Sequence, residues 1–531
     1  MQSAEIRQKF IEFFQSHAHQ PVPSSPLVPA GDPSLLFTNA GMVQFKDVFT
    51  GKEQRSYSRA VSVQKCMRAG GKHNDLDQVG KTARHQTFFE MLGNFSFGAY
   101  FKKEAITFAW TFLTQELHID PEKLWVTVFE TDDEAYQLWQ EISTIPPERI
   151  VRMGEKDNFW MMGDTGPCGP SSEIFIDRGI EHACSDHCGL GQCECDRIEE
   201  IWNLVFMQYN RDETGTLTPL PHPSIDTGMG LERVASYLQG VDSNFDTDLL
   251  APLIHKVEEM SGRSYDKGPA GMPFRVIADH VRALTFLLAE GVSFSNIGRG
   301  YVMRRILRRA VRFGLSLGFE RPFLSKIVPV VAKVMGSAYP EIAGEQDAIR
   351  RMIDEEEERF RLTLNGGMKL LNQKLDELQA GDVLSGSDAF ALYDTFGFPL
   401  DLTVDAAAER GIAVDQEGFD QAMAAQRLRA RQQRTQETLG LPFLGVTEFL
   451  GYEQLTEEEI AIGALYVGSD AVHRLDTGES GWVWLPRTTF YPQGGGQVSD
   501  QGILQTAQGV MRIENVLRVG QAIWHYGTVT A

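Results

Sequence analysis

The chain has 531 residues, of which 42% are hydrophobic and 23% charged, and its formal net charge is −22. A length of this order predicts about three or four globular domains, and the acidic balance argues against a protein that coats nucleic acid over its whole surface. No run of about eighteen apolar residues occurs, so we expect no membrane span. Residues 1–20 are typical of an amphipathic helix rather than a secretory signal, and we expect a cytoplasmic protein.

Residues 1–242 mix strand-like runs with helical stretches and Gly/Pro turns. The clearest strand-like runs lie at 124–129, 173–176 and 204–208. This mixture predicts an α+β or α/β domain built on one sheet.

Residues 243–445 read as helical. Between 349 and 378 the apolar residues recur three, four or seven apart, as on one face of a long helix, and we expect Gly366–Gly367 to interrupt or kink it. The turn "DTFGFPLD" separates this helix from a second helical stretch at 404–438. We expect a helical domain over these residues.

Residues 446–531 change pattern again, because strand-like runs such as "GWVWLP" and "GVMRIENVLRVG" alternate with glycine turns. This alternation predicts a small β-barrel or sandwich. The sequence therefore divides into three expected domains, at 1–242, 243–445 and 446–531.

Residues 64–97 read as a strand, a long polar loop and a second strand that opens with Phe88 and Phe89. The basic residues of the loop are Arg68, Lys72, Lys81, Arg84 and His85. Cations beside exposed aromatic rings suit a nucleotide, since the cations meet phosphates and a ring stacks on the base. The same pattern also fits a solvated hairpin loop above core aromatics.

The segment "IDTGMGLERV" at 225–234 is a glycine-rich turn that runs into a helix carrying Arg233. Glycine lets the backbone approach a ligand closely, and an arginine on the first helical turns can hold a phosphate. A plain helix start with a surface arginine is the alternative. No G-x-x-x-x-G-K-[ST] motif occurs, which excludes a P-loop.

These segments resemble the second and third signature motifs of the class II aminoacyl-tRNA synthetases. The blocks "RAGGKHNDL", "FFEMLGNFSFG", "GDTGPCGP", "EIWNLVF" and "DTGMGLER" are similar to the alanine-specific synthetases in particular. The likeness continues through "NIGRGYVMRRILRRAV" and "LYDTFGFPLDLT", and "FYPQGGGQVSDQG" resembles the opening of that family's editing module. It covers nearly the whole chain.

The resemblance implies an α+β fold, with a six-stranded antiparallel sheet that binds ATP in a bent form. It implies that the carboxylate of alanine attacks the α-phosphate and that the alanyl group then passes to the 3′ end of alanine tRNA. By motif position, Arg68 meets the α-phosphate and His85 and Arg233 the outer phosphates. Phe89 or Met91 contacts the adenine. The resemblance also implies that Mg²⁺ bridges the phosphates, with Glu200 and Asp226 as candidate ligands.

The amino-acid pocket that the resemblance implies matches the three groups of alanine. Asp226 pairs with the ammonium, Trp160 and Val205 wall the methyl group, Asn203 gives a polar contact and Gly228 lies close by. Plain core packing is the alternative role for Trp160 and Val205. A methyl pocket rejects glycine and serine poorly, so a separate proofreading site is expected in the full enzyme.

Residues 301–314 hold five arginines and no acidic residue. On a helix Arg304, Arg308 and Arg312 share one stripe, with Arg305 and Arg309 beside it. Such a face pairs either with an acidic helix, for which "DEEEE" at 354–358 is available, or with RNA phosphates. The resemblance implies the grip on the tRNA acceptor stem.

The same resemblance implies that Asn296 and Asp394 read a G·U pair in that stem, with Asp401 as an alternative to Asp394.

Four of the six cysteines, Cys184, Cys188, Cys193 and Cys195, lie within twelve residues. Four soft ligands at this spacing suit structural zinc, and free thiols in a surface insertion are the alternative.

One absence is informative, because the editing site of the family needs an H-x-x-x-H pair and none occurs here. We therefore expect activation, charging and stem recognition from this chain, without deacylation of mischarged tRNA. Two rival readings stay open. One is a class II carboxylate-adenylating ligase with an acceptor other than tRNA, and the other is a zinc-dependent RNA-binding protein on a vestigial catalytic fold. The sequence does not indicate the oligomeric state.

Overall fold

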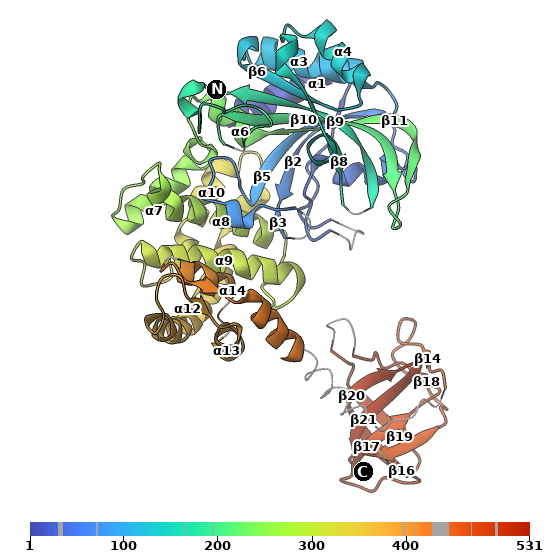
Figure 1. Ribbon diagram of the computed structural model, residues 1–531. Helices are drawn as coiled ribbons and strands as arrows, with labels where there is room; N and C mark the ends of the chain where they lie inside the picture. The colour runs from blue at the N-terminus through green and yellow to red at the C-terminus, as the bar shows by residue number, and fades with distance from the viewer. Residues whose placement is uncertain are drawn as a thin grey trace. The chain divides into compact units, whose positions relative to one another are not determined.

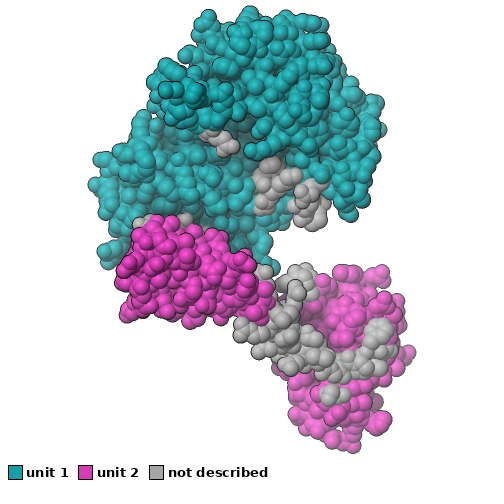
Figure 2. All heavy atoms as spheres, in the orientation of Figure 1, with its two compact units in different colours: residues 1–366 teal, residues 367–531 magenta. Residues whose placement is uncertain are grey.

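We describe the protein from a computed structural model. The structure describes residues 1–29, 35–70, 73–163, 165–193, 195–396, 398, 400–408, 410–426, 445–468, 470–493 and 498–531. These divide into two compact units, Met1–Gly366 and Gly367–Ala531 (Figure 2). None of the helices in the described residues is both long and apolar enough to cross a lipid bilayer.

A mixed sheet of nine strands forms the body of unit 1 (Figure 1). Its strands are β1 Gln20–Pro21, β2 Arg59–Met67, β5 Phe88–Ser96, β6 Leu124–Phe129, β7 Ile150–Met153, β8 Phe159–Met161, β9 Gly166–Asp177, β10 Ile198–Arg211 and β11 Leu217–Gly230. Their order is β1-β2-β5-β11-β10-β9-β6-β7, with β8 on β9. The strands from β2 to β6 pair antiparallel throughout, and only β1 and β7 pair in parallel. The predicted six-stranded antiparallel core and the α+β class are confirmed.

Helices flank this sheet because each buries its apolar face against it. They are α1 Ser3–Ser16, α2 Lys46–Phe49, α3 Lys102–Thr111, α4 Asp133–Ile142, α5 Glu155–Asn158 and α6 Leu231–Leu238. On α1, Phe10 packs edge-on against Phe112 at 5.3 Å and lies 5.8 Å from the Trp202 ring of β10. All three rings are fully buried.

A helical layer completes unit 1 beside β2 and β5 (Figure 1). It contains α7 Ala251–Ser261, α8 Met272–Ala289, α9 Gly298–Ser316, α10 Val328–Met335, α11 Glu341–Gly344 and the first part of α12 Gln346–Asp376. α8 is buried along almost its whole length and its charges are paired, since Arg282 donates to Glu232 at 2.8 Å and Asp279 accepts from the Thr87 amide at 2.9 Å. Helix α6 and the residue just before β5 are thereby tied to the helical layer.

The apolar periodicity between residues 349 and 378 is confirmed by α12, on which Ile349, Ile353 and Phe360 are buried. The expected interruption at Gly366–Gly367 is wrong, because α12 continues through both glycines. A side chain at Gly367 would meet the ring of Phe398 at 2.5 Å, so close packing and not a helix break explains that glycine.

Unit 2 begins with the end of α12 and contains α13 Gly386–Phe396, α14 Leu400–Ala408, a helix over 416–426 and the short pair β12 Val383–Leu384 and β13 Ala413–Val414. The helical stretch predicted at 404–438 contains the end of α14 and the helix over 416–426, with β13 between them, and its part beyond residue 426 lies outside the described residues.

The rest of unit 2 is a six-stranded antiparallel sheet in the order β16-β15-β17-β21-β20-β19. Its strands are β15 Ala464–Val467, β16 Asp470–Val472, β17 Ser480–Trp484, β19 Gly502–Thr506, β20 Gly509–Val519 and β21 Ala522–Val529, and a separate pair joins β14 Glu448–Phe449 to β18 Arg487–Thr488. In the described residues β16 and β19 remain edge strands, so the predicted barrel is not confirmed. The proposed domain division at residues 242 and 445 stays a prediction.

Candidate active site

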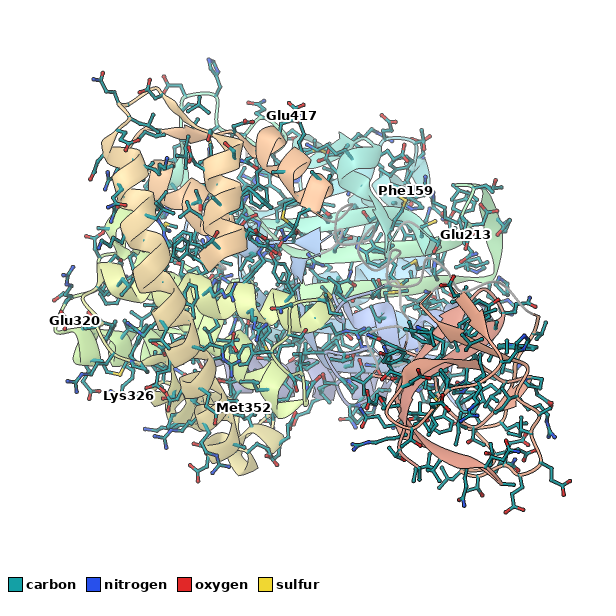
Figure 3. All side chains as sticks on the ribbon, turned by 90° about the horizontal axis from the view of Figure 1, so that it is seen from below. Phe159, Glu213, Glu320, Lys326, Met352 and Glu417 are labelled. Carbon is teal, nitrogen blue, oxygen red and sulfur yellow. The ribbon has the colours of Figure 1, made fainter. Side chains whose placement is uncertain are left out.

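A cavity of about 650 Å³ opens over the antiparallel sheet of unit 1. It is lined from β5, β8, β9, β10, β11 and the loop between β2 and β5, and Figure 3 labels Phe159 of β8, one of its wall residues. All ten residues of unit 1 that we assigned to ATP and alanine lie on this wall: Arg68, His85, Phe89, Met91, Trp160, Asn203, Val205, Asp226, Gly228 and Arg233.

Strand register places the expected alanine-binding residues side by side. Val205 of β10 lies opposite Asp226 of β11, and Asn203 lies opposite Gly228. An added Cβ at Gly228 would meet Met91 Sδ at 2.7 Å, so only glycine lets β11 approach the Met91 side chain of the neighbouring strand. Since paired residues share one face of a sheet, all of these groups border the same space.

Arg68 follows the last residue of β2 and enters the cavity wall beside an aromatic ring. Its Nε donates to the carbonyl of Asn39 at 3.1 Å, and its guanidinium lies 5.1 Å from the centre of the Phe89 ring. A cation and a stacking ring are thus neighbours, as the phosphates and base of a nucleotide require.

Arg233, on the first turn of α6, also lines the cavity, where it lies beside Glu200 of β10. Its Nη1 donates to both the carbonyl of Glu200 at 2.7 Å and the Glu200 carboxylate at 2.9 Å. His85 accepts or donates through Nδ1 to Thr82 Oγ1 at 2.8 Å, and burial lowers the pKa of its imidazole. Burial therefore favours the neutral imidazole, and an anion beside the ring would favour the charged form.

Asp226 is 5% exposed, and no side chain or backbone group in the described residues donates to its carboxylate or pairs with it. Burial raises the pKa of this carboxyl from 3.8 to about 7. A buried carboxylate without a permanent cation is costly on its own, and a ligand cation would remove that cost. The site is consequently suited to a small ammonium group.

The sequence did not identify Glu173 of β9, which also lines the cavity. It lies opposite Asn203 in the β9–β10 register and accepts from Asn203 Nδ2 at 2.8 Å. Burial, and then the charge of Glu200, raise its pKa well above the ordinary value. The run "SSEIF" alternates as a strand but offers no signal for this role, because the partner is 30 residues away along the chain.

Comparison with known proteins identifies the family. Residues 5–531 match the model of the family described as tRNA synthetases class II (A). The chain belongs to the class II tRNA synthetases. Similar proteins are those named alanine–tRNA ligase in Hydrogenovibrio crunogenus, 53% identical over 100% of this chain and 61% of that protein, and in Psychrobacter sp., 51% identical over 100% and 60%. A third, in Halorhodospira halophila, is 52% identical over 99% and 61%. The chain therefore spans about three fifths of the length of these curated relatives.

The four clustered cysteines of this class II chain come together between β9 and β10, and we call Cys184, Cys188, Cys193 and Cys195 the cysteine knuckle. Their four sulfur atoms all lie within 4.8 Å of one another. Three of the Sγ–Sγ distances are 3.4, 3.5 and 3.6 Å. Thiolates about 2.3 Å from a tetrahedral zinc ion lie about 3.8 Å apart, so this arrangement fits zinc. Backbone hydrogen bonding from Cys195 lowers the pKa of Cys193 to about 6, whereas burial raises the pKa of Cys195 to about 12. The fit to zinc therefore depends on the positions of the four sulfur atoms and not on these shifts.

The arginines of α9 all contact other parts of the protein, but they differ in how deeply they are buried. Arg309, which the sequence places beside the arginine stripe, is 5% exposed and lies against His280 Nε2 and the carbonyl of Val79, both at 3.1 Å. Arg304 pairs with Glu356 of α12 at 2.7 Å, so the acidic "DEEEE" segment does engage one member of the stripe. Half-buried residues on the same helix are Arg305, Arg308 and Arg312.

The two residues expected to read the G·U pair are both exposed. Asn296, in the loop before α9, accepts from Arg304 Nη1 at 2.5 Å. Asp394, near the end of α13 in unit 2, accepts from Gln426. The side chain of Asp401 and the whole of Lys72 lie outside what the structure describes.

Proposed function

We propose that this chain uses ATP to convert L-alanine to alanyl-adenylate and transfers the alanyl group to the 3′ end of alanine tRNA. Family membership and the names of the relatives support the reaction class. One arrangement supports the chemistry: Arg68 and Arg233 line the same cavity as Asp226, a buried carboxylate without a cation among the described residues. Cationic groups for the phosphates and an anionic group for the amino acid are thus available together.

In the first step a carboxylate oxygen of alanine attacks the α-phosphorus of ATP, the bond to the bridging oxygen breaks, and pyrophosphate leaves. The nucleophile is already ionised, so positioning and charge neutralisation carry the catalysis. We assign the α-phosphate to Arg68 and the outer phosphates to His85 and Arg233. We assign the adenine to Phe89 or Met91.

Mg²⁺ neutralises charge on the phosphates when it is bound. Glu200 offers a cavity-facing carboxylate, the donor type that this ion prefers, and its charge already raises the pKa of neighbouring Glu173. The Glu200 carboxylate therefore fits the ion and would hold it. We reserve Asp226 for the alanine ammonium, because its surroundings hold no second carboxylate that affects its pKa.

Trp160 and Val205, which line the same cavity as Asp226, are assigned to the methyl group of alanine. Val205 belongs to a buried apolar cluster against which Trp160 and Met91 pack, so these walls are held by the core. Asn203 is fixed by Glu173 and offers its carbonyl oxygen, which no described group satisfies.

Alanine binding is expected to weaken as the pH falls through 7. Asp226 must be ionised to pair with the ammonium, and burial raises its pKa to about 7. Protonation therefore removes the partner at lower pH, while the alanine ammonium stays protonated between about pH 5.5 and 7. We expect kcat/KM for alanine to fall about tenfold per pH unit below 7. Initial rates of pyrophosphate exchange at several pH values measure this, and a flat profile would contradict it.

For tRNA we propose that Arg305, Arg308 and Arg312, together with Arg304, contact the acceptor-stem backbone, and that Asn296 and Asp394 contact its G·U pair. The arginines of α9 support this proposal by their charge, and a helix of this kind fits RNA recognition through phosphates and shape.

The variant Arg308→Gln/Arg312→Gln is expected to raise the KM for tRNA about tenfold. The plot of log(1/KM) for tRNA against log salt concentration should also become less steep, by about 2 in its slope. Pyrophosphate exchange without tRNA should be unchanged. Arg350→Gln/Arg351→Gln on α12 is the matched control, and equal losses in both variants would count against the placement.

Alanine-dependent exchange of pyrophosphate into ATP tests the activation step directly. Absence of exchange in a folded, ATP-binding protein would refute the proposal. Exchange without transfer to alanine tRNA would instead favour an adenylating ligase with another acceptor, which no observation on this chain supports at present.

A further inference from the structure

A second cavity of about 520 Å³ adjoins the active-site cavity, and the proposed mechanism does not yet use it. Residues that line both cavities form the boundary between them, and they include His85, Glu173, Glu200 and Arg233. Strands β6, β9 and β10 and the cysteine knuckle contribute further walls of the second cavity. The second cavity therefore extends from the active site to the knuckle.

The residues assigned to ATP and alanine divide between the two cavities according to the group that each is to bind. Those assigned to the adenine, the α-phosphate and alanine all line the active-site cavity, and none of them lines the second cavity. His85 and Arg233, which are assigned to the outer phosphates, line both. When the bond between the α-phosphorus and the bridging oxygen breaks, pyrophosphate is therefore beside the second cavity, while the adenylate remains in the first.

A buried hydroxyl on β6 lines the second cavity and not the first. Thr127 is 1% exposed, and its Oγ1 has no hydrogen-bond partner among the described residues. Thr127 pairs with Glu173 in the register of β6 and β9, so both side chains leave the sheet on the face that carries the cavities. An unpaired buried hydroxyl costs free energy, and a ligand oxygen that accepts from it would remove that cost. Phosphate oxygens are acceptors of this kind.

Lys156 of α5 supplies a positive charge to the same space. Its side chain is exposed and lines both cavities. In the part of the chain that the structure describes, no carboxylate forms an ion pair with its ammonium group. A lysine ammonium is a compact charge on a flexible stem, so it can follow a phosphate group from one cavity into the next.

The acidic residues on the boundary present little unpaired negative charge to an anion. Glu200 pairs with Arg233 at 2.9 Å. Burial, and then the charge of Glu200, raise the pKa of Glu173, which favours its uncharged form. Asp157 also lines both cavities, but it is exposed, so solvent and salt screen its charge. The second cavity is thus open to a doubly or triply charged anion.

We propose that the second cavity is the pyrophosphate-release site: pyrophosphate enters it after the activation step, and the Thr127 hydroxyl and Lys156 bind it there. This inference rests on the proposed function. No bond forms or breaks in the second cavity, because the bridging oxygen keeps the electron pair of the broken bond and leaves as a terminal oxygen of pyrophosphate. Removal of pyrophosphate from the adenylate slows the reverse attack before the alanyl group is transferred.

The experiment measures pyrophosphate exchange with pyrophosphate, ATP and alanine varied in turn, and calorimetry of Mg²⁺-pyrophosphate binding without turnover. Thr127→Val is expected to raise the KM and the calorimetric Kd for pyrophosphate about tenfold, because a hydrogen bond to a charged group is lost. Its KM values for ATP and alanine should be unchanged. Lys156→Gln is expected to raise the KM for pyrophosphate about threefold, since its charge is exposed.

Two control variants match these substitutions. Ser62→Ala removes another buried hydroxyl that has no partner among the described residues, and Lys123→Gln removes another exposed lysine. Neither residue lines either cavity, so both variants should keep the wild-type KM for pyrophosphate. Valine has nearly the shape of threonine and buries no unpaired hydroxyl, so the melting temperature of Thr127→Val should equal or exceed that of the wild type. If Thr127→Val fails to fold, the comparison of Lys156→Gln with Lys123→Gln still decides.

The inference is overturned if Thr127→Val leaves the KM for pyrophosphate unchanged, if its KM for ATP rises by the same factor, or if Ser62→Ala has the same effect. A wild-type chain that catalyses no exchange would refute the proposed function itself, and calorimetry would then still test the pyrophosphate site. Normal exchange in the wild type and in both cavity variants would refute only the release site.

Discussion

Asp226→Asn is expected to lower kcat/KM for alanine by two to four orders of magnitude while leaving ATP binding intact. The carboxylate is buried on the cavity wall, and no described cation competes for it. Removing one member of a buried charge pair costs about 3–5 kcal/mol, and each 1.4 kcal/mol corresponds to a factor of ten. Pyrophosphate exchange over a range of alanine concentrations, together with calorimetry of ATP binding, measures the two effects separately.

The loss should not come from unfolding. Burial raises the pKa of Asp226 from 3.8 to about 7, so the unfolded chain releases this proton more readily than the folded chain. The folded state therefore loses stability as the pH rises from 3.8 to about 7, and an asparagine has no such titration. We expect the melting temperature of the variant at pH 8 to equal or exceed that of the wild type. Asp212→Asn, in the exposed turn between β10 and β11, is the control, and an equal loss of exchange there would contradict the assignment.

The residues of the cavity wall were predictable because short-range patterns identify them. Arg68 ends a strand before a polar loop, and Arg233 begins a helix after a glycine turn, so each carries a local signature. That they line the same cavity follows from the register of β5, β11 and β10, which pairs residues far apart in sequence. The resemblance to a known family supplied that information, and periodicity alone did not.

Contacts between distant elements were the part that the sequence did not reveal. Helical spacing groups the arginines of α9 correctly, but it does not show which side of the helix the neighbouring α8 covers. Arg309 is therefore buried against His280 although its neighbours are more open. In the same way, Glu173 and Asn203 meet only because β9 and β10 pair, and Arg84 meets Asp196 across 112 residues of sequence.

Arg68→Lys is expected to lower kcat for exchange by about a hundredfold to a thousandfold, with a smaller change in the KM for ATP. A donor aimed at charge that develops in the transition state contributes about this much. Lysine keeps the positive charge, but it lacks the planar guanidinium, which can donate two hydrogen bonds to a phosphate and stack on an aromatic ring. A fall in kcat with similar ATP affinity would show that the geometry of the guanidinium, and not charge alone, stabilises the attack on the α-phosphate.

Arg59 at the other end of β2 makes this test specific. Its guanidinium also lies 5.1 Å from an aromatic ring, that of Tyr100, and donates to a backbone carbonyl at 3.1 Å, the same two distances that Arg68 shows. Arg59 does not border the cavity. Arg59→Lys therefore reproduces the structural cost of the substitution without touching the reaction. If both variants lost the same activity, the effect of Arg68 would be structural, and the α-phosphate would need a different partner on this wall.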